Sequence, residues 1–382
     1  MKILIASEFR CTLCNNKYYL APKAFTIYKR YADVFGIIDL CCRVEKKDFV
    51  LEGYKEAIFI DKVVEIDSLL NVLLGKSKKI MIQEIRNCDL VIARIPSMIA
   101  YKAADYARIE NKPYFAELMG DAWDSYWNHD FWGKCIALYM DRKMRKITWD
   151  SNYSLYVTDK YLQYRYPSKN QKSINASNVV INEVNEEILR GRLNRIDSFD
   201  KTSISLMTTA AVDVKPKGQQ YVIKAMKTLK ESGINVTYYL AGGGNQDFLK
   251  KIARKEGVKS QVVFLGELTI RDVYKYIDIA DIYIQPSLQE GLPRSVIEAM
   301  SRGCPCVGSK TAGTPELIEE EYTFKRSSSD AIVESINYIL SRDLKKIAMR
   351  NFEFAKKYKN EFLDKRRNEF FYRVKKELED QM

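Results

Sequence analysis

Short apolar runs alternate with amphipathic stretches through roughly the first half of the chain. Runs such as "KILIAS", "GIIDLCC" and "CDLVIARI" have the length of buried strands, while "PKAFTIYKRYADVF" and "AYKAADYARIENK" carry apolar residues at helical spacing. Strands that alternate with helices are typical of βαβ units, which build a parallel sheet. The pattern predicts an α/β, Rossmann-like domain over residues 1–185.

One helix of this domain can be delimited by its ends. Pro22 is a favoured helix start and Gly36 a favoured stop, so the helix is predicted between them. Its core face is expected to hold Ala24, Ile27, Tyr28, Tyr31 and Phe35, and its outer face to hold Lys23, Lys29 and Arg30. The outer face of this helix is therefore predicted to be basic.

The strand and helix alternation is lost over residues 183–201 and then restarts. The polar stretch "EVNEEILRGRLNRIDSFDK" is predicted to connect two domains. A second doubly wound α/β domain follows over residues 200–360, with strands such as "NVTYYLAGGG" and "DIYIQPS". Residues 362–382 are predicted to form a terminal helix that packs back on the first domain. Two such domains facing a cleft would bind ligands at the carboxyl ends of their strands.

Composition narrows the class of protein without fixing its function. Hydrophobic residues make up 46% of the 382 residues and charged residues 29%, as in ordinary globular proteins. No apolar run approaches the roughly 18 residues of a membrane span, so a cytoplasmic location is expected. The net charge of +12 favours acidic partners, which include nucleic acid, nucleotide phosphates and an anionic membrane surface.

The eight cysteines are expected to be reduced thiols, mostly in the core, because the chain is long and shows no export signal. Cys11 and Cys14 form one CxxC pair. No second pair follows at zinc spacing, so this pair is a weak signal for a metal or redox site.

The most informative stretch is "PSLQEGLPRSVIEAMSRGCPCVGSKTAGTPE", residues 286–316. Pro293 and Gly303 delimit a predicted helix over residues 293–302, which places Glu290 in the loop before it. Gly291 lets the backbone approach a ligand, and the free amides of a first helical turn favour an anion such as phosphate. Glu298 lies five residues after Pro293, which is about 7.5 Å along the helix axis.

A carboxylate beside a phosphate pocket is favourable when the same ligand donates hydrogen bonds to it, and sugar hydroxyls are such donors. Glu290 and Glu298 are therefore candidates to bind a diol. The alternative is that Glu298 pairs with Arg294 and Arg302 in a surface ion cluster.

The segments "EGLPRSVIEAM", "GCPCVGS" and "TAGTPELI" resemble the donor-site signature of the retaining GT-B glycosyltransferases of family four, which has two glutamates separated by seven residues. The preceding "LAGGG", "VVFLGEL" and "IADIYIQPS" are similar to that family in order and spacing, so the resemblance covers residues 203–320. The Leu-Pro-Arg variant resembles enzymes that build bacterial surface polysaccharides.

The resemblance implies a role for each matching position. Glu290 would contact the donor sugar, Glu298 the ribose diol, and the amides near Gly291 and Leu292 the diphosphate. Gly242 would also lie at the donor, and the backbone from Gly266 to Leu268 would contact the base. The donor-binding set implied in this way is Glu298, Gly291, Leu292, Arg294, Lys215, Gly242, Gly266 and Leu268.

The same family commonly neutralises the diphosphate with an Arg five residues before a Lys-Gly. Here Lys217 precedes Gly218, whereas Val212 stands at the place of the Arg. Lys217 is therefore implied as catalytic together with Glu290. Lys215 or Arg294 is expected to supply the missing positive charge.

The first half of the chain departs from the family pattern. Its first loop, "EFRCTLCNNKYYLAP", is not rich in glycine. Asp121, which follows "PYFAELMG", is predicted as a catalytic polar contact of the acceptor site, with a helix cap as the alternative. His129 lies among aromatic residues, where a structural role competes with a catalytic one.

The expected activity is transfer of a sugar, with retention, from a nucleotide sugar to a hydroxyl of a glycan or lipid-linked acceptor in surface polysaccharide synthesis. No metal or other cofactor is expected, because protein cations would stabilise the leaving diphosphate. Nucleic acid is not expected as a partner. Peripheral contact with the anionic inner face of the plasma membrane is predicted through Lys23, Lys29, Arg30 and the basic tail. A sugar-nucleotide epimerase on the same fold and a non-catalytic nucleic-acid or membrane binder stay open as alternatives.

Overall fold

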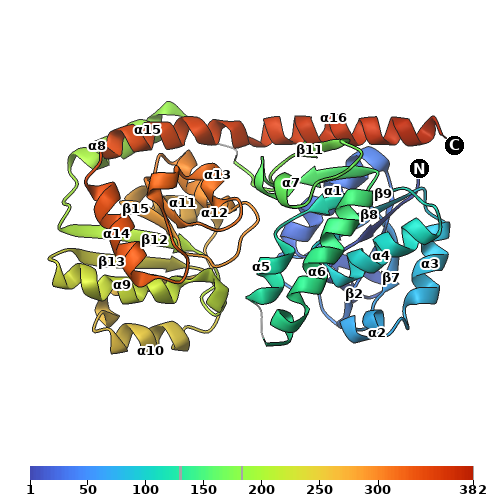
Figure 1. Cartoon of the computed structure of the whole chain (residues 1–382), viewed down its shortest axis with the longest axis horizontal. Helices are drawn as coiled ribbons and strands as arrows, with labels where there is room; N and C mark the ends of the chain where they lie inside the picture. Colours follow the sequence, from blue (N-terminus) through green and yellow to red (C-terminus); the bar gives the residue numbers. More distant parts are fainter. Residues whose placement is uncertain (129–130, 182–183, 382) are drawn as a thin grey trace. The chain divides into compact units, whose positions relative to one another are not determined.

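A computed structural model describes residues 1–128, 131–181 and 184–381. The chain forms two compact units (Figure 1). Unit 1 holds Met1–Tyr126, Lys134–Ala176 and Asp364–Met382, and unit 2 holds Trp127–Gly133 and Ser177–Leu363. Each unit is built on a parallel sheet with helices, so the predicted class of two Rossmann-like α/β domains is confirmed.

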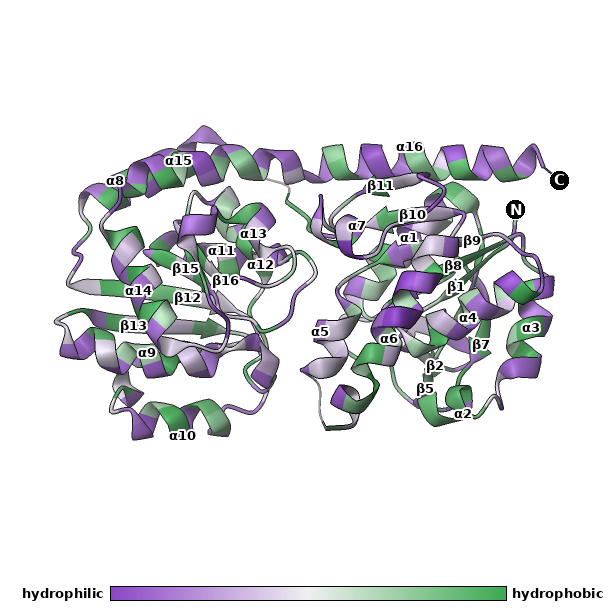
Figure 2. Ribbon diagram, viewed as in Figure 1, coloured by the Kyte–Doolittle hydropathy of each residue, from purple (hydrophilic) through white to green (hydrophobic). Residues whose placement is uncertain are grey.

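The main sheet of unit 1 consists of short parallel strands, of which the five central ones are buried and the two at the edges are partly exposed (Figure 1). In spatial order they are β11 (Ser173–Asn175), β10 (Tyr153–Tyr156), β9 (Tyr114–Leu118), β8 (Leu90–Ile95), β1 (Ile3–Ala6), β4 (Ile38–Cys42) and β7 (Ile60–Glu65). Figure 2 shows central strands such as β1 and β8 in the green of apolar residues, as expected for a sheet covered on both faces.

The helices of unit 1 in chain order are α1 (Pro22–Phe35), α2 (Leu69–Leu73), α3 (Lys78–Arg86), α4 (Met98–Ile109), α5 (Ala122–Trp127), α6 (Phe131–Asp150) and α7 (Tyr161–Arg165). A smaller sheet beside them has the order β5 (Val44–Lys46), β2 (Cys11–Cys14), β3 (Lys17–Leu20) and β6 (Lys55–Glu56). The cysteines of the chain are free thiols, all buried except Cys135. Burial raises the pKa of the Cys11 thiol to about 12, so this thiol stays protonated.

Helix α1 begins at Pro22 and ends at Phe35, next to Gly36, and its predicted core face is confirmed. The prediction of a basic outer face is wrong for Arg30. The Arg30 side chain is only 12% exposed and lies 3.7 Å from the Asp364 carboxylate. Lys29 is exposed, but it pairs with Asp33 one helical turn away. Much of the positive charge of this face is therefore neutralised within the protein.

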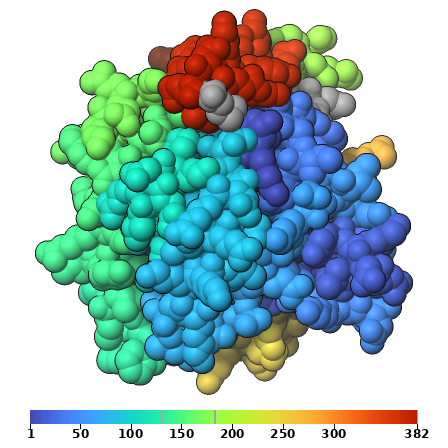
Figure 3. Space-filling view, turned by 90° about the vertical axis from the view of Figure 1, so that its right-hand side faces the viewer, coloured from blue at the N-terminus to red at the C-terminus, as the bar shows by residue number. Residues whose placement is uncertain are grey.

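The long helix α16 (Asn360–Glu379) joins the core of unit 1 with its last four turns. Phe371 stacks on Tyr31 of α1 with ring centroids 4.8 Å apart, and the Lys375 ammonium donates to the Val34 carbonyl. Figure 3 shows this red helix lying against the blue residues of the chain's beginning. The end of the chain thus completes the first unit, because its apolar residues fill that unit's core.

The sheet of unit 2 is also parallel and doubly wound. Its spatial order is β14 (Val262–Gly266), β13 (Asn235–Ala241), β12 (Ser203–Thr209), β15 (Ile282–Gln285), β16 (Cys306–Ser309) and β17 (Thr323–Phe324). Its helices are α8 (Glu186–Asp197), α9 (Gln219–Glu231), α10 (Asp247–Lys255), α11 (Ile270–Ile279), α12 (Arg294–Ser301), α13 (Thr314–Leu317), α14 (Ser329–Leu340) and α15 (Leu344–Ala355). Short 3-10 turns are η1 (Lys215–Lys217), η2 (Lys259–Gln261), η3 (Glu320–Tyr322) and η4 (Lys356–Tyr358).

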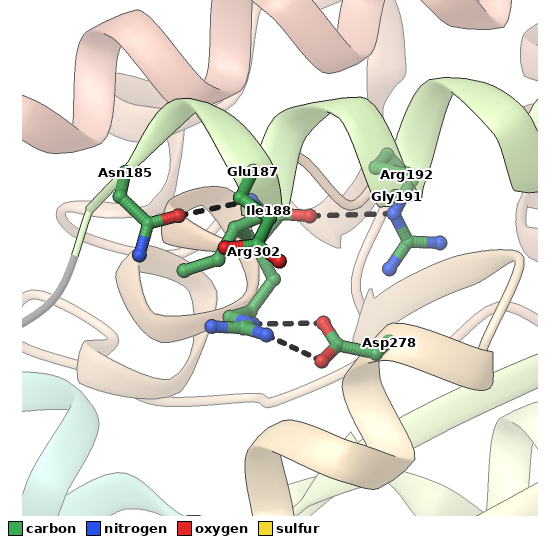
Figure 4. A pocket seen from close by; sticks show the side chains of 7 residues that line it. All are labelled: Asn185, Glu187, Ile188, Gly191, Arg192, Asp278 and Arg302. Atoms are coloured by element: carbon green, nitrogen blue, oxygen red, sulfur yellow. Dashed lines mark hydrogen bonds and ion pairs between the residues drawn. The ribbon is translucent and has the colours of Figure 1, made fainter.

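The polar stretch predicted as a connection is helix α8, and it packs on unit 2. Asn185 caps its first turn by accepting from the Ile188 amide, as Figure 4 shows. Arg192 is 3% exposed, and its guanidinium donates to the carbonyls of Ile277 and Ala280 at 2.6 Å. The buried cation thus satisfies carbonyls at the end of α11. This partnership is tertiary, so the polarity of the segment gave a wrong prediction of its role.

A carboxylate–lysine pair at the sheet edge of unit 2

The order of strands in unit 2 reverses next to β12. Along the chain, β13 and β14 follow β12 on one side of it in the sheet, and β15 is then placed on the other side of β12. Ligands of doubly wound sheets bind at the carboxyl ends of the strands at such a switch point. The two loops concerned are 210–218 after β12 and 286–293 after β15, and the second is the stretch singled out from the sequence.

Backbone contacts join these two loops tightly. The Leu288 amide donates to the Pro216 carbonyl at 2.8 Å. Gly218 has a left-handed φ of +77°, and a Cβ at this position would stand 2.0 Å from the Pro286 carbonyl oxygen. Only glycine fits there, because any side chain would push the two loops apart.

Lys217 and Glu290 meet where the loops join. The Lys217 ammonium lies 2.8 Å from Oε1 of Glu290, and the two side chains are 30% and 12% exposed. Gln285 at the end of β15 donates its amide to the same oxygen at 3.0 Å. Both donors use Oε1, so Oε2 of Glu290 retains its capacity to accept a hydrogen bond from a ligand hydroxyl.

Gln285 is a site residue that reasoning from the sequence missed. It is 1% exposed, and its Oε1 accepts from the hydroxyls of Ser295 and Tyr283 at 3.1 and 3.2 Å. Its Nε2 also donates to Ser287 at 2.9 Å. Gln285 therefore fixes the orientation of Glu290. The available signal was a polar residue at the end of an otherwise apolar strand.

Glu298 is half-buried on α12, and burial raises the pKa of its carboxyl from the ordinary value, with the Arg294 charge opposing this rise. Arg302, one alternative partner, instead binds Asp278 with Nε at 2.7 Å from Oδ1 (Figure 4). The surface ion cluster proposed as an alternative for Glu298 therefore lacks its Arg302 member. Within the described chain the Glu298 carboxylate has no hydrogen bond or ion pair, and it is available to a ligand.

The two candidates for the missing positive charge differ in placement. Lys215 is exposed, and its ammonium lies 5.0 Å from the ring centroid of Phe248 on α10. Arg294 is exposed in the first turn of α12, close enough to Glu298 to oppose the rise of its pKa. Val212, at the position of the family's Arg, is buried in the core. The geometry therefore favours Arg294 over Lys215.

The remaining predicted donor residues are distributed along the same edge. The Gly242 amide donates to the Gly266 carbonyl at 2.8 Å, which joins the loops after β13 and β14. Leu268 follows two residues later and is half-buried. The Gly291 carbonyl accepts from the Gly313 amide at 2.9 Å, and Leu292 is 7% exposed. Gly242 also has a packing role, because a Cβ there would stand 2.1 Å from the Ala210 carbonyl oxygen.

Among the described residues near this edge, buried polar side-chain atoms without a protein hydrogen-bond partner include Oε1 of Gln289 and Oγ1 of Thr314. Unpaired buried polar groups are costly, and a ligand that pairs with them recovers part of that cost. A further cation, Arg326, donates to the Leu288 carbonyl at 3.1 Å and so contacts the loop that carries Glu290. No motif in the sequence indicates Arg326, because it lies in a loop outside the recognised motifs.

Asp121 of unit 1 is a structural residue. It is 2% exposed, and Oδ1 accepts from the Asp124 amide and the Tyr166 hydroxyl, both at 3.1 Å. Oδ2 accepts from the Tyr161 hydroxyl at 2.7 Å and lies 2.5 Å from the Arg165 guanidinium. The Tyr166 hydroxyl has one proton and lies closer to Asp141, at 2.8 Å, so three donors are certain for the four acceptor positions of the Asp121 carboxylate. The placement of Asp121 fits the helix cap, which the sequence left open as the alternative to an acceptor contact. His129 lies outside the described residues.

A cavity of about 400 Å³ beneath α8 is lined by the exposed Glu187 and by three charged residues that are already paired, Arg192, Asp278 and Arg302 (Figure 4). Arg302 and Asp278 bind one another, and Arg192 binds backbone carbonyls. The cavity therefore offers fewer open charges than the edge near Glu290. None of the described helices combines the length and the hydrophobicity that a membrane crossing requires.

Comparison with known proteins gives a consistent result. Residues 196–358 match the family described as glycosyl transferases group 1. Protein CapJ of Staphylococcus aureus is 28% identical over 345 residues, covering 88% of this chain and 86% of CapJ. The amylovoran biosynthesis glycosyltransferase AmsK of Erwinia amylovora is 36% identical over 110 residues, which is 27% of each chain.

Among solved structures, HepE of Anabaena in complex with UDP and glucose is similar over 97% of this chain and 98% of its own, with a TM-score of 0.65 and 17% identity. At this identity the similarity concerns the fold. The fold is the GT-B arrangement of two Rossmann-like domains that the resemblance implied.

Proposed function

We propose that this chain, which belongs over residues 196–358 to the glycosyl transferases group 1 family, transfers a sugar from a nucleoside diphosphate to a hydroxyl of a glycan or lipid-linked glycan. The observation that carries the proposal is the Lys217–Glu290 pair at the switch point of unit 2. A cation and a carboxylate side by side suit a ligand that has both an anionic diphosphate and a hydroxylated sugar.

The reaction needs stabilisation of the departing diphosphate. Lys217 and the first-turn amides of α12 offer positive charge at this edge of the sheet, and Arg294 extends that charge along the helix. Charge aimed at a developing anion is commonly the largest catalytic contribution of a site of this kind. These groups support a metal-independent reaction, in which protein cations act on the diphosphate.

In this proposal Oε2 of Glu290 accepts from a donor-sugar hydroxyl while Oε1 stays bound to Gln285 and Lys217. Glu298, unpaired and half-buried, accepts from the ribose diol. A half-buried carboxylate loses hydration, and hydrogen bonds from a diol recover part of that cost. Retention at the anomeric carbon is proposed from the resemblance to retaining enzymes of family four.

The comparisons suggest donors and a process. HepE was solved with UDP and glucose, so UDP-hexoses are the first donors to test. AmsK is named for amylovoran biosynthesis, and we propose that this chain likewise acts in the synthesis of a surface polysaccharide, at the cytoplasmic face of the plasma membrane. Unit 1 is proposed to bind the acceptor.

The first experiment is thermal unfolding of the whole chain with UDP, GDP, dTDP and CDP. A ligand that binds only the folded state stabilises it by mass action and so raises the unfolding temperature. At a ligand concentration 100 times the dissociation constant, the free energy of unfolding rises by about 2.7 kcal/mol. We expect one diphosphate to shift the transition and Glu298→Ala to weaken its binding by roughly 10- to 150-fold, as for loss of a charged hydrogen-bond acceptor.

Glu334→Ala is the matched control, because Glu334 is an exposed glutamate on α14 of the same unit. Its binding of the diphosphate should equal that of the native chain. If none of the four diphosphates shifts the native transition, and none of their hexose conjugates is consumed, the donor-site proposal is wrong.

A further inference from the structure

Helix α6, which belongs to unit 1 from Lys134 onward and to unit 2 at its first three residues, exposes several large apolar side chains. Trp132, Tyr139 and Trp149 are 75%, 57% and 51% exposed. Phe131 and Leu138 are exposed to a similar degree. The opposite face of the helix is buried through Ala137, Met140, Met144 and Ile147. The exposed side chains therefore form a second apolar face that the fold of unit 1 leaves uncovered.

Their spacing places most of them on one line of the helix. Positions 131, 135, 138, 142, 146 and 149 follow one another at intervals of three or four residues, which brings side chains onto the same face of an α-helix. Aromatic residues stand at both ends of this line. We refer to Phe131, Cys135, Leu138, Tyr139, Arg142, Lys146 and Trp149 as the α6 stripe.

The charges within the α6 stripe are positive. Arg142 and Lys146 are exposed, and neither has an ion-pair partner in the described part of the chain. The carboxylates of α6 are already engaged. Asp141 is 6% exposed and binds the guanidinium groups of Arg145 and Arg165, whereas Asp150 binds Arg108 at 2.9 Å.

An apolar face interrupted by unpaired cations fits one chemical environment better than others. At the surface of an anionic bilayer, tryptophan and tyrosine rings lie at the level of the headgroups, and arginine and lysine contact lipid phosphates. We propose that the α6 stripe docks unit 1 on an anionic phospholipid membrane, with its rings among the headgroups and with Arg142 and Lys146 on phosphate.

This surface differs from the one predicted from the sequence, which comprised Lys23, Lys29, Arg30 and the basic tail. The predicted patch on α1 contains Arg30, which is buried against Asp364, and Lys29, which is paired with Asp33. The α6 stripe has unpaired cations and apolar area together, and interfacial binding draws on both. A nucleic acid would use the cations and stack on the rings, but it would gain little from the aliphatic side chain of Leu138.

The test is co-sedimentation of the full chain with vesicles of phosphatidylcholine in which about one third of the lipid is anionic phosphatidylglycerol. Arg142→Gln with Lys146→Gln should weaken binding about 30-fold, the equivalent of about 1 kcal/mol for each cation. Tyr139→Ser with Trp149→Ser should weaken it by roughly tenfold or more through lost apolar contact. Native binding should fall when the vesicles contain phosphatidylcholine alone.

Two matched double variants control for charge and exposure. Lys227→Gln with Lys230→Gln removes two exposed lysines from α9, and Tyr164→Ser with Tyr372→Ser removes two exposed aromatic residues outside the α6 stripe. Both should bind vesicles as the native chain does. All variants change exposed residues, so their unfolding temperatures and their response to a nucleoside diphosphate should stay native, which separates this test from that of the donor site.

The proposal is overturned if the native chain does not sediment with the anionic vesicles, or if the α6 variants bind as the native chain does. It is also overturned if the control pairs weaken binding equally, because the attraction would then be a general effect of net charge. Two further results would assign the stripe to another partner. One is a lipid-free dimer that Tyr139→Ser with Trp149→Ser dissociates, and the other is tighter binding of a single-stranded oligonucleotide that the same variant loses.

Discussion

Each unit carries an acidic residue just beyond the carboxyl end of a strand in a parallel sheet, and the two residues are held very differently. Asp121 follows β9, and donors of unit 1 engage both of its carboxylate oxygens. Glu290 follows β15, and both of its protein donors bind Oε1. The two residues thus occupy equivalent positions in their sheets, but only Glu290 has a carboxylate oxygen that can still accept a hydrogen bond from a ligand. A carboxylate at a sheet edge is a ligand site only where its own neighbours leave it incomplete.

The largest expected effect tests the Lys217–Glu290 pair, in which a carboxylate oxygen remains open to a ligand. Lys217→Ala should lower sugar transfer by about 10²- to 10³-fold, as loss of one group that stabilises transition-state charge does in other enzymes. The measurement is kcat/KM for consumption of the nucleotide sugar identified by thermal unfolding. Lys227→Ala on α9 is the matched control and should remain fully active. Native activity in Lys217→Ala would remove Lys217 from the mechanism.

The role of Asp121, whose carboxylate is bound by protein donors, is tested by its effect on the free energy of unfolding. Asp121→Ala should lower the free energy of unfolding by about 3 kcal/mol, near the lower limit for breaking a buried ion pair, because Arg165 is 27% exposed. Chemical denaturation measures this loss. Asp33→Ala, which removes an exposed pair with Lys29, should change stability by less than about 0.5 kcal/mol. A stable Asp121→Ala protein with impaired transfer would restore Asp121 as an acceptor contact.

A smaller effect should distinguish the two candidate cations of the donor site. Arg294→Gln should weaken diphosphate binding by about fivefold, the equivalent of about 1 kcal/mol for a charge near the start of a helix. Lys215→Gln should change it by less than about twofold, because the Lys215 ammonium lies over Phe248. Titration calorimetry can compare the two variants directly. The reverse order of effects would make Lys215, and not Arg294, the second cation that contacts the diphosphate beside Lys217.

The smallest effect concerns pH. Burial raises the pKa of Glu298 in the folded chain, so ionised Glu298 opposes folding above that pKa, and its protonated form does not. Glu298→Gln should therefore unfold at a slightly higher temperature than the native chain at pH 7. This gain should shrink as the pH falls from the raised pKa toward the ordinary value of 4.5, and it should vanish below 4.5, where Glu298 is protonated in both the folded and the unfolded chain. A gain that is constant with pH would show that ionisation of Glu298 is not its cause.

The sequence determined the periodic features of this protein. Two α/β units, the core face of α1 and the order of elements around Glu290 all follow from apolar spacing and from proline and glycine positions, because these act over a few residues. The motif also marked Lys217, Glu290 and Glu298 before any contact was known.

Only the tertiary structure decided how charged side chains are used. Arg192, in a polar segment, binds carbonyls of α11, and Arg30 is buried against α16 from the other end of the chain. Asp121 is closed by donors from α7, whereas Glu298 is left without a protein partner. A charged residue is stabilised by whichever groups lie within a few ångströms of it, and those groups come from segments distant in sequence. Local pattern locates such a residue, and packing determines whether it supports the fold or remains open to a ligand.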